Sequence, residues 1–221
     1  MKRKRFLINI PGQQTFFRIQ TKRIGSTLLI LLIFVCFTSK VLAQQQTEGI
    51  FLTADDFSKM KVSFPHCSTN KKYKFNSDEI FNTSHIKLTI GDSVIRLMKD
   101  SIFGYRDKRN FCYRFFNHVA YRILNPREKI LLYSKTFLAG VPRNIHYVTN
   151  YYFSVNPDSP IYSLSLWNLK MVLKDDMAFH LLLNAYFSND NELIEYDKLS
   201  NKYILNRIYE ESKRSLVKLN N

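Results

Sequence analysis

Two prolines close together divide the chain into a part with strand patterns and a part with helix patterns. Asn156-Pro-Asp-Ser-Pro160 ends the strand pattern, because proline has no N–H to give to a β-ladder. Before it, runs rich in aromatic and β-branched residues predict strands over roughly residues 49–155. Beyond it, apolar residues recur with a helical period, and we expect about three helices over roughly residues 163–216. We therefore predict an α+β fold, a mainly antiparallel sheet followed by helices that pack on it.

The strongest strand signal is a hairpin over residues 85–98. Gly91-Asp92 separates two alternating runs, which is typical of a two-residue turn. The register that follows puts apolar residues on one face and sets Lys87 opposite Arg96 on the other, so we expect that second face to be solvated. Near the start of the domain, Thr53 precedes Ala-Asp-Asp and predicts the cap of a short helical turn. The other predicted strands are Gly49–Thr53, Lys61–Phe64, Lys72–Phe75, Ile102–Tyr105, Phe111–Phe116, Tyr121–Leu124, Ile130–Ser134 and Ile145–Val155.

The helical part predicts two short helices and one longer one. The short helices cover residues 163–173 and 176–187. Asn189 and Glu192 have the spacing of a capping box, which predicts that a longer helix begins there and continues to about residue 212. One side of that helix would form an apolar stripe that docks on the sheet or meets a partner. The stripe consists of Leu193, Tyr196, Leu199, Tyr203 and Ile204.

The N-terminus has the features of an export signal. Residues 1–43 hold eight basic and no acidic side chains, and residues 24–37 form an apolar core that is too short to span a bilayer. Small residues before Gln44 predict cleavage between Ala43 and Gln44; the alternative is an uncleaved anchor whose Lys40 reaches the membrane surface. In both cases the positive-inside rule predicts export of residues 44–221, as one domain, to the periplasm or outer surface of a bacterium.

The positive charge of the chain is concentrated in this leader. The formal net charge is +15, but the 25 basic and 18 acidic residues after position 43 leave +7 for the body. Nucleic acid is therefore not the expected partner, since the body leaves the cytoplasm. Contact with a membrane is expected only through residues 24–43.

Export also changes the interpretation of the cysteines. Removal of the leader leaves Cys67 and Cys112, and two thiols in an oxidising compartment predict a Cys67–Cys112 disulfide. The alternatives are two buried free thiols or a catalytic cysteine.

Glycine spacing excludes several well-marked enzyme classes. The closest glycines in the body are 13 residues apart, so a dinucleotide-binding turn, a Walker loop and a nucleophile elbow are all excluded. The zinc-protease, EF-hand and paired Cys-x-x-Cys patterns are absent, and no two histidines have the spacing of a helical metal site. The sequence therefore predicts no catalytic residue, no cofactor and no metal site.

The most unusual stretch, residues 106–122, interleaves basic and aromatic side chains. As a strand it would set Tyr113 on one face and Cys112 with Arg114 on the other. One interpretation is a core face with solvated arginines; the other is a basic-aromatic surface that binds an anionic polymer. The candidate binding residues are Arg106, Lys108, Arg109, Tyr113, Arg114, Tyr121 and Arg122.

Four segments resemble a family of small, exported, uncharacterised bacterial envelope proteins with no known activity. They are Gly49–Phe57, Lys99–Asp107, Tyr113–Phe116 and Tyr151–Ser159, and the resemblance covers roughly residues 48–200. It implies a place in the bacterial envelope and supplies no activity, cofactor or catalytic residue.

The function expected from these features is that of a non-catalytic envelope protein. It would bind an anionic envelope polymer or an envelope protein through the basic-aromatic surface. The alternative is an envelope hydrolase whose site forms only in three dimensions, for which two convergent carboxylates or a histidine–carboxylate pair in a polar pocket would be the mark.

Overall fold

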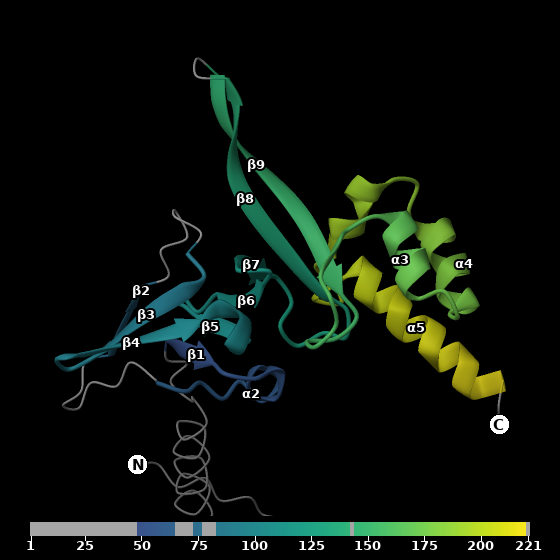
Figure 1. The fold of residues 1–221 in the computed structure, drawn as a ribbon. Coiled ribbons are helices and arrows are strands. Elements are labelled where there is room, and N and C mark those ends of the chain that lie inside the picture. The colour runs from purple at the N-terminus through teal and green to yellow at the C-terminus, as the bar shows by residue number, and fades with distance from the viewer. Residues whose placement is uncertain (1–47, 65–72, 77–82, 142–143, 220–221) are drawn as a thin grey trace, which may run out of the picture. The chain divides into compact units, whose positions relative to one another are not determined.

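The computed structural model describes residues 48–64, 73–76, 83–141 and 144–219. The predicted leader, with its cleavage site between Ala43 and Gln44, lies outside these ranges. Within them the chain has the predicted α+β fold, with antiparallel strands first and most of the helical residues after them (Figure 1).

The described strands form one large sheet and two small ones. The large sheet contains β1 (Gly49–Phe51), β5 (Gly104–Arg106), β6 (Cys112–Phe116), β7 (Val119–Ile123), β8 (Leu131–Val141), β9 (Asn144–Ser154) and β10 (Tyr162–Ser163). Its strand order is β1-β5-β6-β7-β8-β9-β10, and every neighbouring pair is antiparallel. The small sheets pair β2 (Tyr73–Asn76), β3 (His85–Ile90) and β4 (Ser93–Met98), and β11 (Tyr196–Asp197) with β12 (Lys202–Tyr203).

The hairpin β3–β4 has the predicted register. Lys87 lies opposite Arg96, both side chains are exposed, and the opposite face buries Ile86 and Leu88. Two predicted strands differ from the structure by more than two residues. Residues 61–64 contribute only an isolated bridge from Ser63, and the strand expected over residues 130–134 continues to residue 141 as β8.

Both faces of the large sheet are covered around β6. On one face Phe115 packs with Ile86 and Leu88 of β3. On the other face Cys112 packs in a cluster with Phe57 of α2 (Ala54–Ser58). The cap predicted for this helix is confirmed, since the Thr53 hydroxyl accepts from the Asp56 N–H at 3.0 Å. A strand in this position has no solvated face.

The helices pack on the start of β8 and the end of β9, which lie side by side. The core there joins Leu132 and Phe153 of the sheet to Leu169, Leu183 and Leu205 of the helices. The helices are α3 (Leu166–Val172), α4 (Met177–Tyr186) and α5 (Ile204–Leu219), together with the 3₁₀ turns η2 (Lys99–Ser101) and η3 (Asp190–Ile194). No helix within the described ranges has the length and apolar character needed to span a membrane.

The single long helix predicted from Asn189 does not form. Asn189 does act as a cap, but of the short turn η3, and the β11–β12 hairpin separates η3 from α5. The Asp197 carboxylate accepts from the Leu199 N–H at 2.9 Å and closes a local turn. Such side-chain bonds to the backbone compete with helix formation. Leu199, expected in the apolar stripe, is 99% exposed, so the predicted stripe was wrong.

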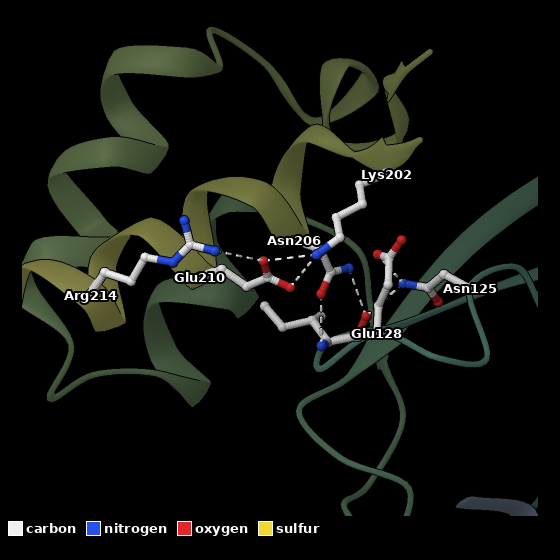
Figure 2. A network of polar contacts seen from close by, with 7 residues as sticks. Asn125, Glu128, Lys202, Asn206, Glu210 and Arg214 are labelled. Carbon is white, nitrogen blue, oxygen red and sulfur yellow. Dashed lines mark hydrogen bonds and ion pairs between the residues drawn. The ribbon is translucent and has the colours of Figure 1, made fainter. Parts of the chain in front are cut away.

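Two buried asparagines hold the chain where β8 begins (Figure 2). The Asn206 side chain of α5 accepts from the Ile130 N–H at 2.9 Å and donates to the Ile130 carbonyl at 2.9 Å. The Asn125 side chain donates to the same carbonyl at 2.8 Å and accepts from the Leu132 N–H at 2.6 Å. Because buried peptide groups need partners, this clamp fixes the start of β8 against the C-terminal helix.

Candidate functional site

The outer halves of β8 and β9 pair only with each other. At the base, β7 pairs with β8 at Ser134 and Tyr133, and β10 pairs with β9 at Tyr152 and Phe153. The β8–β9 ladder then continues to the pair Val141 and Asn144. We call residues 135–141 and 144–150 the ribbon; its two strands pair beyond the last residues that β7 and β10 reach, and Figure 1 shows them extending past β7.

Along the β9 side of the ribbon, the outward peptide groups have no partner among the described residues. The Leu164 N–H donates to the Tyr151 carbonyl at 3.0 Å, so the peptide groups of Tyr151 point away from β8. Peptide groups alternate in direction along a strand. Those of Thr149, Tyr147 and Ile145 therefore also point outward, and no described residue hydrogen-bonds to them.

The β8 side of the ribbon is less open. The Lys135 ammonium donates to the Ala120 carbonyl of β7 at 3.4 Å, which sets a charged side chain at the base of this edge. Near the tip Gly140 has φ +111°, outside the extended conformation of a strand. Charges and local distortions are devices that protect sheet edges from further pairing. In the described part of β9 no residue has a positive φ, so its edge is regular.

Large apolar side chains are exposed on both faces of the ribbon. Tyr147 is 77% exposed and its cross-strand neighbour Leu138 is 62% exposed, on one face. In the ribbon, the exposed large apolar residues are Leu138, Ile145 and Tyr147 on this face, and Phe137 and Val141 on the other. Single exposed apolar residues are ordinary, but a contiguous group marks an interaction surface.

The ribbon lies in a stretch without acidic residues. Between Glu128 and Asp158 the sequence has no aspartate or glutamate, whereas it has Lys129, Lys135 and Arg143. Within residues 144–150 the one ionisable group besides tyrosine is His146. The β9 edge therefore carries little formal charge.

A pocket of about 300 Å³ lies beside the base of the ribbon, where β10 stops pairing with β9. Its one carboxylate is Asp190, whose Oδ1 accepts from the Leu166 N–H at 2.7 Å and so helps to hold α3. No histidine and no basic residue lines it. The lining residues are Thr149, Asn150, Tyr151, Tyr152, Ser163, Leu164, Asp190, Asn191 and Ile194. The pocket leaves open space next to the first unpaired residue of β9, Thr149.

Two of the predicted binding arginines are buried, so they do not form part of an exposed surface. Arg106 is 4% exposed and Arg114 is 6% exposed. The Arg114 guanidinium lies 5.5 Å from the ring centre of Phe103 and donates to the Tyr133 hydroxyl at 3.1 Å. The prediction treated one face of this strand as solvated, whereas α2 and β3 cover both faces.

The other predicted binding residues are scattered over partly buried and exposed places. Arg122 stacks over the Phe111 ring at 3.7 Å, and Tyr121 packs edge-on against Tyr152 at 5.0 Å. Tyr113 stacks on Tyr105 and is half-buried. Lys108 and Arg109 are exposed in the turn between β5 and β6.

Cys112 carries a free, buried thiol, so the predicted disulfide is not formed in this structure. The predicted partner, Cys67, lies outside the described residues. Burial raises the pKa of the Cys112 thiol to about 11. Because the thiolate is the reactive form, such a thiol is inert at neutral pH.

Two carboxylates near the asparagine clamp are held by hydrogen bonds from neighbouring side chains. Glu210 accepts from the Lys202 ammonium at 2.6 and 2.8 Å, and Glu128 accepts from the Asn125 amide at 2.9 Å (Figure 2). Burial raises the pKa of Glu128, while the bond from Asn125 and the charge of Lys202 oppose that rise. These bonds connect the β11–β12 hairpin, α5 and the turn before β8, which gives the carboxylates a structural role. Among the described residues no group of three or more metal-ligating side chains converges.

The absence of acidic residues is the one feature of the sequence that coincides with the ribbon, and the strand prediction did not take it into account. Residues 135–141 were not predicted to belong to a strand, but they lie within the acid-free stretch.

Comparison of the chain with protein-family models, with curated proteins and with solved structures found no match.

Proposed function

We propose that this protein is a binding module that holds another polypeptide on the ribbon by strand addition. The observation that carries the proposal is the row of outward peptide groups at Ile145, Tyr147 and Thr149, which no described residue pairs. An extended segment laid along β9 would supply the missing hydrogen bonds, and its side chains would cover the exposed apolar ones.

A polypeptide fits this surface better than a lipid or a polymer does. A lipid surface would accept Tyr147 and Leu138 but offers the unpaired peptide groups no fixed partners. An anionic polymer needs a field of exposed cations. In the ribbon the Lys135 ammonium already bonds to Ala120, and Arg106 and Arg114 lie in the interior.

The place of action in this proposal is the bacterial envelope. The apolar core at residues 24–37 and the predicted cleavage before Gln44 support export, and the body would then meet other envelope proteins. The binding module needs no cofactor for this role.

Photocrosslinking in the cell that makes the protein tests the proposal. A benzophenone amino acid replaces Tyr147 in one variant and Leu181 in a second; Leu181 is an exposed apolar residue of α4 and serves as the matched control. Irradiation is expected to join position 147, and not position 181, to a protein, which mass spectrometry of the adduct identifies. Equal protein capture at both positions, or lipid adducts alone at position 147, would overturn the proposal.

A further inference from the structure

We infer that the polypeptide held by β9 is the same strand of a second copy of this chain, so that two ribbons form one four-stranded sheet. This inference rests on the proposed strand addition and adds the edge, the register and the partner. A strand that pairs with its own copy does so about a twofold axis, and the surface must then be complementary to itself.

The β9 edge determines one register for such a pair. The Tyr151 carbonyl already accepts from Leu164, so the open edge in the described part of β9 begins at Thr149 and continues through Tyr147 to Ile145. Its centre is Tyr147. A twofold axis at Tyr147 sets Tyr147 opposite its copy and Ile145 opposite Thr149 of the second copy. All three outward positions on each chain are then paired, whereas a shift in either direction leaves outward groups without partners.

The side chains are compatible with this register. On one face the row across the four strands would read Leu138, Tyr147, Tyr147 and Leu138, since Leu138 and Tyr147 are cross-strand neighbours within each ribbon. Aromatic and aliphatic residues in such rows stabilise sheets. Residues 144–150 contain no lysine, arginine or carboxylate, so the paired segments bring no like charges together.

The structure also leaves room for the added strand. A neighbouring strand lies about 4.8 Å away, and a pocket adjoins β9 at Thr149, with Leu164 and Ile194 in its lining. Ile145 of the second copy would lie next to Thr149, which lines this pocket. On the β8 edge, the Lys135 ammonium and the non-extended backbone at Gly140 disfavour a comparable pairing.

Proline substitutions distinguish the two edges. Tyr147→Pro and Leu138→Pro each remove one N–H that points away from the ribbon, and proline is tolerated where the N–H faces solvent. The full chain, purified in a mild detergent, is measured by sedimentation equilibrium, with circular dichroism as the folding control. The parent is expected to have the mass of two chains. Tyr147→Pro is expected to reduce it to one chain, and Leu138→Pro is expected to leave it at two.

Crosslinking supplies an independent measurement of the register. Cysteine at position 147 would lie about 4.5–5.5 Å, Cβ to Cβ, from its copy. Cysteine at position 138 would lie three strand spacings, about 14 Å, from its copy. A bis-maleimide whose reach is shorter than that spacing is expected to give a covalent dimer with Tyr147→Cys and only the parent's background with Leu138→Cys.

Several results would overturn the inference. They are a monomeric parent, a dimer that Tyr147→Pro leaves intact, equal loss of the dimer in both proline variants, and equal crosslinking of both cysteine variants. If the photocrosslinked protein at position 147 is a different polypeptide, the proposed function stands and self-pairing is wrong. If position 147 captures no protein, both are wrong.

Discussion

Reversing the charge of Arg114 tests whether the predicted basic surface is an interior. Arg114 is 6% exposed, packs against the Phe103 and Phe116 rings, and has no carboxylate partner among the described residues. A glutamate there would bury an unpaired negative charge, which costs about 3–5 kcal/mol. Arg109, exposed in the β5–β6 turn, provides the matched control. Arg109→Glu is expected to change the free energy of unfolding by less than about 0.5 kcal/mol.

Replacing Arg114 by methionine separates burial from charge. If Arg114 is removed, the Tyr133 and Ser154 hydroxyls still bond to each other at 2.8 Å, so no polar group loses its last partner. Replacing buried ion pairs by apolar side chains of similar volume is often neutral or stabilising, and Arg114 leaves no charged partner behind, so Arg114→Met should cost much less free energy of unfolding than Arg114→Glu. Urea denaturation followed by circular dichroism measures all three variants. An interior position of Arg114 is refuted if Arg114→Glu has the same free energy of unfolding as the parent, or if Arg114→Met loses as much of it as Arg114→Glu does.

Three further predictions follow from buried contacts. At pH 8 iodoacetamide should leave Cys112 unmodified in the folded protein and label it in urea, because burial raises its pKa to about 11; peptide mass mapping checks this, and rapid labelling of the folded protein would contradict it. Burial disfavours the charged Asp176 carboxyl, but the hydrogen bond from Lys213 and other bonds outweigh it and hold its pKa below the ordinary 3.8. Its stabilisation is therefore present above pH 3.8 and lost as the pH falls through the lowered pKa. The difference in unfolding free energy between the parent and Asp176→Asn should be about 1–2 kcal/mol at pH 7 and vanish in acid, whereas a difference independent of pH would contradict the ion pair. Gly104→Ala should cost about 1–3 kcal/mol in urea denaturation, because the added Cβ would overlap the Tyr113 carbonyl oxygen; an unchanged midpoint would show that the strand shifts freely.

Features that depend only on residues close together in the sequence could be predicted, such as a hairpin register and a helix cap. The β3–β4 register follows from Gly91-Asp92 and the alternation on either side of it, which are contained within 14 residues. The Thr53 cap depends on two hydrogen bonds with Asp56, three positions away. Features of this kind need no knowledge of the rest of the molecule.

The burial of Arg114 and the ribbon were not predictable in the same way. Arg114 is interior because the sheet strand β3 and the helix α2, both distant in sequence, cover the two faces of β6. The open edge of β9 exists because its neighbour β10 contains only two residues, whereas β9 contains eleven. Alternation within one strand carries no information on where its neighbours end.

The asparagine clamp cannot form until the chain has been synthesised as far as Asn206. Ile130 obtains the partner for its N–H from Asn206, 76 residues further along the chain. At ordinary rates of synthesis those residues take roughly 4–15 s to make. Once residue 153 has been made, Leu132 and Phe153 both exist, but Leu205, which packs with them in the complete protein, does not. We expect the nascent chain to expose this apolar cluster until α5 has been made, and a chain that stops before Leu205 to keep it partly uncovered.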